Sequence, residues 1–312
     1  MSNTNRRTIH PFLPSTTILL LSLVCSCGLF SSSDGAPWNE VAYSQGGSIF
    51  VHDLNTGSNR RIIESGAYPV RWSPDGKMIA FGKRVAPWPD CQLCIADHNG
   101  NNLRVVSLSE HDGIIEPHPD GGGYPVWSPD GSRIAFMRFG IIFIADIDTS
   151  SGLVIDRLSD HSFGETPLDW HDGSLLIWSR LGVDGSEDIY ADCYWLNIST
   201  HSRERIFAST DTFASYYFRY SQEGDLIAFI GRRGSEREIY AMNADGSDVK
   251  RITFNDLDER HLSWSPDGKK LVFMAGSDFT GGNLYVMNRD GSECHRIVSS
   301  MNNSFCPEWR PY

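Results

Sequence analysis

The chain has 312 residues, of which 27 are Lys or Arg and 39 are Asp or Glu, so its net charge is −12 at neutral pH. This negative balance excludes a nucleic acid backbone as the expected partner. The 29 glycines, 15 prolines and 12% aromatic residues favour short strands joined by many turns over long helices.

The first 26 residues are typical of an export signal. Arg6 and Arg7 give a positive start, residues 18–24 form an apolar run too short to cross a bilayer, and Val24-Cys25-Ser26-Cys27 resembles a bacterial lipobox. We expect residues 1–26 to be a signal peptide and Cys27 to be the lipidated first residue of the mature protein. An ordinary cleaved signal and an uncleaved anchor are the alternatives.

The segment after Cys27 predicts a tether. Gly28, rather than Asp, follows Cys27, which in the lipoproteins it resembles leaves the anchor free to reach the outer membrane, facing the periplasm. Residues 27–39 contain the run SSSDGAP at 31–37, a composition typical of a flexible linker. We expect the folded domain to cover residues 40–312.

One five-letter unit, Trp-Ser-Pro-Asp-Gly, occurs at residues 72–76, 127–131 and 264–268. Its Ser hydroxyl opens a tight turn, its Pro presets φ, its Asp tolerates the third position and its Gly adopts a positive φ. This combination predicts a β-hairpin corner. The Trp before each corner can then seal its small sheet against the next sheet.

The corners belong to six rounds of strands. Corner tryptophans or their substitutes stand at positions 72, 127, 170, 220, 264 and 309, spaced 43 to 55 residues apart. The predicted strands cover residues 41–44, 49–53, 60–63, 68–72, 78–81, 93–97, 103–106, 124–127, 134–137, 142–146, 154–158, 167–170, 175–178, 193–197, 205–207, 217–220, 226–230, 239–243, 249–253, 262–264, 271–274, 284–288, 295–298 and 305–309. Four strands per repeat at this period indicate a β-propeller.

The two chain ends predict how the ring closes. The first round lacks its leading strand, whereas residues 305–309 supply a surplus strand. We therefore predict an all-β fold, a six-bladed β-propeller of four-stranded blades in which the C-terminal strand joins the first blade. We expect the protein to be a monomer.

Several phrases resemble the TolB family of propellers. They are the WSPDG corners and the runs at 238–247 and 283–292, which read EIYAMNADGS and NLYVMNRDGS and are each followed by an Arg-Ile pair. The resemblance covers residues 40–312 and implies the fold and a non-catalytic, protein-binding role in the cell envelope. TolB itself has an additional N-terminal α/β domain and is soluble in the periplasm, whereas this chain carries a tether and a predicted lipid anchor.

Strand order places the WSPDG corners and the Asn-x-Asp-Gly turns on one face of the ring, which we call the corner face. The loops between second and third strands and between blades share the opposite loop face, and longer loops usually carry binding. This face is acidic, and Trp88 between two prolines is a candidate aromatic anchor. The predicted partner-binding residues are Trp88, Asp90, Glu110, His111, Asp112, Glu116, His118, His161, Glu165, Asp256, Asp258, Glu259 and His261.

These residues would attract a basic segment of an envelope protein or hold a cation such as calcium near the channel mouth. Alternatively, they are solvated turn residues of an acidic protein. The histidines also suggest a metal-dependent carbohydrate-active enzyme that resembles oligogalacturonate lyases, and a glycan or peptidoglycan binder is a third hypothesis. Because these histidines lack ligand spacing and no Gly-x-Ser-x-Gly occurs, we expect no catalytic residue, metal or cofactor.

The cysteines leave two alternatives. Cys91 and Cys94 open a predicted strand rather than a helix, so they do not match a thioredoxin-like redox site. The sequence predicts either a local Cys91–Cys94 bridge or buried free thiols at Cys94 and Cys193. If Cys27 is acylated, five cysteines of the mature chain remain and at least one is unpaired.

Overall fold

The computed structural model describes residues 39–311, except for 65–66, 85–90, 107–122, 139–140, 148–154, 158–164, 182–189, 211–212, 234–235, 278–280 and 302–303. Residues 37–312 form one compact unit. Its described residues build 24 β-strands, arranged as six antiparallel four-stranded sheets. Within these ranges no helix has the length and apolarity needed to cross a membrane.

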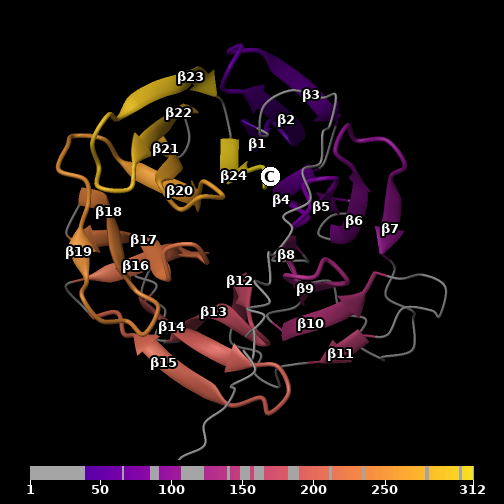
Figure 1. Cartoon of the computed structure of the whole chain (residues 1–312), viewed down its shortest axis with the longest axis horizontal. Helices are drawn as coiled ribbons and strands as arrows, with labels where there is room; N and C mark the ends of the chain where they lie inside the picture. The colour runs from indigo at the N-terminus through magenta and orange to yellow at the C-terminus, as the bar shows by residue number, and fades with distance from the viewer. Residues whose placement is uncertain are drawn as a thin grey trace, which may run out of the picture. The chain divides into compact units, whose positions relative to one another are not determined.

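Each sheet is one blade, and its strands follow one another outward from the centre of the ring (Figure 1). Blades 1 to 3, innermost strand first, contain β24 (Ser304–Trp309), β1 (Glu40–Gln45), β2 (Ser48–Asp53), β3 (Asn59–Ile63); β4 (Ala67–Trp72), β5 (Met78–Arg84), β6 (Cys91–Asp97), β7 (Arg104–Val106); and β8 (Gly123–Trp127), β9 (Arg133–Arg138), β10 (Ile141–Asp146), β11 (Ile155–Arg157). Blades 4 to 6 contain β12 (Glu165–His171), β13 (Ser174–Leu181), β14 (Tyr190–Asn197), β15 (Arg203–Phe207); β16 (Ala214–Ser221), β17 (Leu226–Arg233), β18 (Glu236–Asn243), β19 (Lys250–Arg251); and β20 (Glu259–Trp264), β21 (Lys270–Ser277), β22 (Gly281–Asn288), β23 (His295–Met301).

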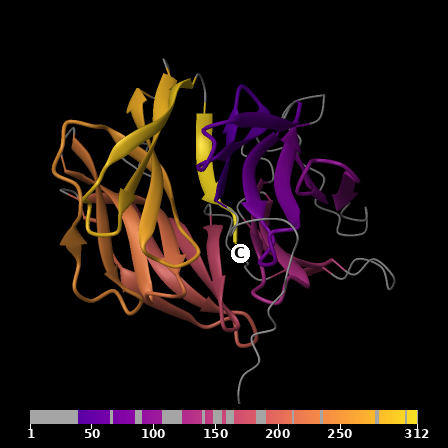
Figure 2. The same ribbon diagram turned by 45° about the horizontal axis from the view of Figure 1, so that its top comes forward.

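The C-terminal strand closes the ring. β24 pairs antiparallel with β1, with Trp309 opposite Val41 and Glu308 opposite Ala42. Figure 2 shows the yellow β24 beside the indigo strands of blade 1. The six innermost strands contact one another in a closed cycle, β4, β8, β12, β16, β20, β24 and back to β4. The predicted six-bladed propeller and its closure are confirmed.

The corner turns form through the hydrogen bonds and the positive φ that their residue types predict. In the first copy, Ser73 Oγ donates to Asp75 Oδ1 at 2.6 Å and accepts from Met78 N at 2.9 Å, while Gly76 N donates to Ser73 O at 2.8 Å. Gly76 has a φ of +64°. The same Ser–Asp and Ser–backbone bonds recur in the copies at residues 128–133 and 265–270.

The corner tryptophans join neighbouring blades. Trp127 packs with Leu93 and Ile95 of blade 2, and its Nε1 donates to Arg71 O at 3.3 Å. Trp264 Nε1 likewise donates to Arg219 O, in blade 5, at 3.0 Å. The sheet that each of these tryptophans seals is therefore that of the preceding blade.

The corners and the turns between third and fourth strands lie on one face, as predicted. His98 N donates to Lys77 O at 2.9 Å, and Arg289 N donates to Lys269 O at 2.8 Å. These bonds tie each such turn to the corner of its own blade. The loop face is consequently the opposite end of the channel.

The innermost strands begin earlier than their sequence pattern predicts. β20 starts at Glu259 rather than Leu262 because its pairing with β21 contains a β-bulge between Arg260 and Leu262. The extra residue, His261, has a φ of +40°. A bulge breaks the period-two alternation on which the prediction depended.

Candidate functional site

The centre of the ring is lined by the residue just before each corner aromatic. Side chains alternate between the two faces of a strand. When the corner aromatic packs on the preceding blade, the residue before it therefore lies on the other face of the innermost strand, beside the channel. These residues are Arg71, Val126, Asp169, Arg219, Ser263 and Glu308, one from each innermost strand.

The four charged members form one network, which we call the channel network: Arg71, Asp169, Arg219 and Glu308. Arg71 pairs with Glu308 at 2.6 Å, and Arg219 pairs with Asp169 at 3.3 Å and also with Glu308. Arg71 donates to Leu168 O at 3.1 Å and Arg219 to Leu262 O at 2.9 Å. Because the four side chains come from four different blades, their bonds cross the channel.

Burial dominates the titration of this network. Burial raises the pKa of Asp169 to about 7; Arg71 and the Tyr220 amide oppose this rise, and the Glu308 carboxylate adds to it. Burial also raises the pKa of Glu308. The network therefore binds or releases a proton near neutral pH.

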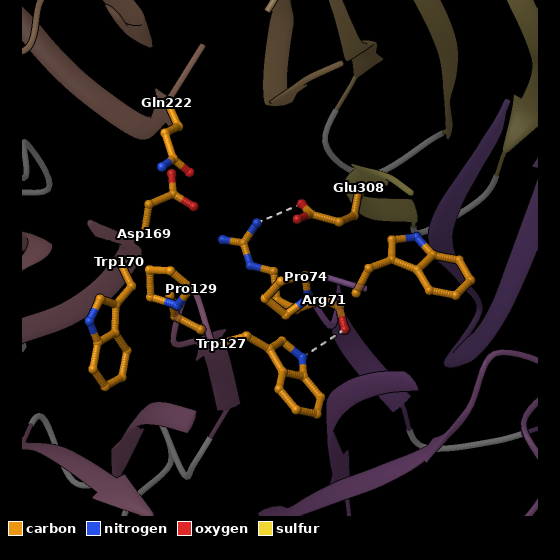
Figure 3. Close-up of a pocket in the computed structure, with 10 residues that line it drawn as sticks. Arg71, Pro74, Trp127, Pro129, Asp169, Trp170, Gln222 and Glu308 are labelled. Carbon is orange, nitrogen blue, oxygen red and sulfur yellow. Dashed lines mark hydrogen bonds and ion pairs between the residues drawn. The ribbon is translucent and has the colours of Figure 1, made fainter. Parts of the chain in front are cut away.

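A recess of about 200 Å³ lies beside the network (Figure 3). It is lined by Arg71, Trp72, Pro74, Val126, Trp127, Pro129, Asp169, Trp170, Gln222 and Glu308. Pro74, Pro129 and Gln222 are exposed corner residues, so the recess opens on the corner face. The sequence pattern directed attention to the other end of the channel.

Most of the predicted partner-binding residues are outside the described part of the chain. These are Trp88, Asp90, Glu110, His111, Asp112, Glu116, His118 and His161, together with the lipidation candidate Cys27. Glu165 begins β12, and its side chain is also outside the described set. Their roles stay predictions.

The structure describes four of the predicted residues on one stretch, and it places them in different environments. Asp256 is exposed, and Asp258 pairs with Arg237 at 3.2 Å and with Arg260 at 2.5 Å. Glu259 is 0% exposed, although it was predicted as a surface contact. Burial, and then the Glu238 carboxylate, raises the pKa of Glu259 to about 7.

His261 is buried inside the ring rather than presented on the loop face. Its ring lies 4.0 Å from that of Tyr217, and its Nδ1 lies 3.4 Å from Cys306 Sγ. Burial, followed by the charges of Arg260 and Arg237, lowers the pKa of His261 to about 3. The imidazole is therefore neutral at physiological pH, and within the described ranges no three His, Cys, Asp or Glu side chains are grouped to hold a metal ion.

The cysteines settle one alternative. Cys94 and Cys193 are buried free thiols, as one prediction had it, so the predicted Cys91–Cys94 bridge is wrong. Cys91 and Cys94 both lie on β6.

Comparison with known proteins agrees with this architecture. The family described as PD40, TolB beta propeller domain, matches residues 83–311. An uncharacterized protein of Agrobacterium fabrum is 27% identical over 197 residues, which span 60% of this chain and 61% of that protein. The match thus covers less than two thirds of this relative's length.

Solved structures share the fold at low sequence identity. TolB from Acinetobacter baumannii has a TM-score of 0.67 at 19% identity, covering 88% of this chain and 67% of its own. A putative TolB from Agrobacterium tumefaciens has a TM-score of 0.63 at 18% identity, covering 89% and 100%. Oligogalacturonate lyase in complex with manganese has a TM-score of 0.53 at 14% identity, covering 80% and 70%. At these identities the likeness concerns the fold alone.

Proposed function

The chain belongs to the TolB β-propeller domain family, and from this premise we propose that it is a non-catalytic scaffold of the bacterial cell envelope. It binds a protein partner, by a basic segment, through the loop face and the channel mouth. Cys27 anchors it to the outer membrane by a lipid, so that the ring faces the periplasm.

The observation that best supports a binding role is the channel network. Its charged side chains hold one another across the ring, through pairs such as Arg71–Glu308 and Arg219–Asp169. A lumen crossed by ion pairs suits a partner that docks against the ring better than one that threads through it. The exposed Asp256 and the net charge of −12 favour a basic partner surface.

Site-specific photocrosslinking in cells tests the docking face. We expect a photoreactive residue at Asp256 to give one discrete crosslinked protein, identified by mass spectrometry. The matched control is Glu204, an exposed position on the outer strand β15, which should give none. Equal crosslinking from both positions would contradict a loop-face site.

A separate assay tests the absence of catalysis. Purified protein incubated with manganese and oligogalacturonate should release no unsaturated product. Turnover that disappears when His111, His118 or His161 is changed to Ala would instead establish the carbohydrate-active enzyme.

The anchor has its own test. Cys27→Ser should move the protein from the membrane fraction to the soluble periplasmic fraction, because the acyl chains need the Cys27 thiol. Unchanged fractionation would reject lipidation at this residue and leave the docking proposal standing.

A further inference from the structure

The corner-face recess has an unbalanced lining. Of the four network residues, Arg71, Asp169 and Glu308 line it, whereas Arg219 is not among its lining residues. Two carboxyl groups therefore face the recess with one guanidinium. Figure 3 shows the Arg71 guanidinium between these two carboxyl groups, with Gln222 next to Asp169.

The oxygens are also the more accessible charges. The Asp169 side chain is 23% exposed and that of Glu308 17%, compared with 11% for Arg71. An incoming group thus meets hydrogen-bond acceptors before it meets donors. This polarity selects a donor with positive charge.

The walls suit an alkyl chain that carries such a charge. They consist of indole and proline rings, including Trp127, Pro74 and Pro129. The wall indoles attract cations within the protein itself, since Arg310 lies 4.9 Å over Trp72 and Arg133 lies 5.0 Å over Trp170. The recess of about 200 Å³ has room for one long side chain.

We propose that this recess binds a primary ammonium carried on an alkyl chain, as in a lysine side chain that the protein partner presents to the corner face. The methylenes lie against Pro74, Pro129 and Trp127, and the ammonium donates to Asp169 and Glu308. A compact ammonium fits better than a second planar guanidinium, because the Arg71 guanidinium already donates to Glu308 and to Leu168 O beside the recess. The inference rests on the proposed partner binding and adds a second contact, at the opposite end of the channel from the loop face.

The surrounding charges predict how binding depends on pH. The charged side chains at the ammonium position are Arg71, Asp169 and Glu308, and Arg219 lies behind the two carboxylates, paired with both of them outside the recess lining. Because the pKa of Asp169 is about 7, a cation binding here displaces a proton. Affinity should rise about ninefold between pH 6 and pH 8, as a carboxyl of this pKa goes from about 10% to about 90% ionised.

Titration of the full-length protein with small probes tests the proposal, followed by NMR of the tryptophan indole N–H groups. N-acetyl-lysine amide should shift the signals of Trp127 and Trp170, more tightly at pH 8 than at pH 6. N-acetyl-norleucine amide, which has the alkyl chain without the charge, and N-acetyl-glutamate amide should not. Equal binding of norleucine, tighter binding of glutamate, or no binding of lysine would each overturn the proposal.

Variants at the exposed rim keep the test independent of folding. Gln222→Glu should tighten lysine binding about threefold and Gln222→Lys should weaken it about threefold, by charge alone. Asp169→Asn should weaken it about tenfold, and Glu293→Gln, an exposed corner-face control outside the recess, should leave it unchanged. Insensitivity to the charge at position 222 would contradict the proposal. If the probe fails while crosslinking from Asp256 persists, the recess inference fails and the docking proposal stands.

Discussion

Arg310 shows how one side chain can hold distant parts of the chain together. It is 1% exposed, its Nε donates to Gly76 O at 2.9 Å, and its Nη1 pairs with Glu40 Oε2 at 2.5 Å. It also stacks on Trp72. A buried guanidinium is tolerated only when its donors are satisfied, so these three contacts depend on one another.

Arg310→Ala should therefore lower the free energy of unfolding by about 3 kcal/mol, because Glu40 loses its buried partner and keeps only the more exposed Arg60. Urea denaturation of the purified protein measures this change. Arg289→Ala, at an exposed turn, is the control and should stay within about 0.5 kcal/mol of the wild type. If both variants lose equally little, the contacts of Arg310 do not stabilise the ring.

Asp169 makes the stability depend on pH. Its pKa is about 7 in the folded protein and near the ordinary aspartate value of 3.8 when unfolded, so the folded state holds a proton that the unfolded state releases between these values. The free energy of unfolding should fall as pH rises from about 4 to about 7 and level off above. Asp169→Asn should lack this part of the fall, whereas the opposite trend from His261 is common to both proteins. Parallel pH profiles in urea would contradict the assignment.

At the scale of the element, the corner turns differ in what surrounds their glycine. Gly76 and Gly173 both have positive φ, +64° and +80°. A Cβ on Gly76 would lie 2.9 Å from the backbone oxygen of Pro311, whereas a Cβ on Gly173 would meet nothing within 4 Å. The first corner therefore needs glycine for its backbone angle and for space, and the second only for its angle.

Gly173→Ala should cost about 1 kcal/mol, the strain of a left-handed alanine, and Gly76→Ala at least about 2 kcal/mol because the chain end must also move. Thermal unfolding of the two variants measures the difference. Equal losses would mean that Pro311 shifts freely.

The strands were largely predictable from the sequence, because the residues of the corner turns and the alternating apolar residues mark all 24 of them. The exceptions have a local cause. In β16 and β20 the residues Tyr217 and His261 have positive φ, at β-bulges that no residue type in the sequence indicates. The buried state of Glu259 was missed for the same reason, because it precedes the bulge and reads as a loop carboxylate.

At the scale of the whole molecule, the sequence indicates which positions line the channel, but it does not indicate which of their charged side chains pair. Because the position before each corner aromatic repeats in all six rounds, the channel-lining residues can be identified from the sequence repeat. Their ion-pair partners cannot be identified in this way, because Arg219 and Glu308 meet only after blade 6 is placed between their blades. Charge pairing across a ring depends on closure, which is a property of no single repeat.

The closure of the ring by β24 can be tested by deleting this strand from the chain and adding it back as a separate peptide. A chain ending at residue 303 should lose its cooperative thermal transition and aggregate, because β1 loses its pairing with β24 and Val272 and Met274 of blade 6 lose Trp309. A peptide of residues 304–312 added in trans should restore the transition by strand addition. The same peptide with Glu308→Lys should not, since its ammonium would face Arg71 and Arg219. A truncated chain that melts like the full one would show that five blades and an open sheet suffice for the fold.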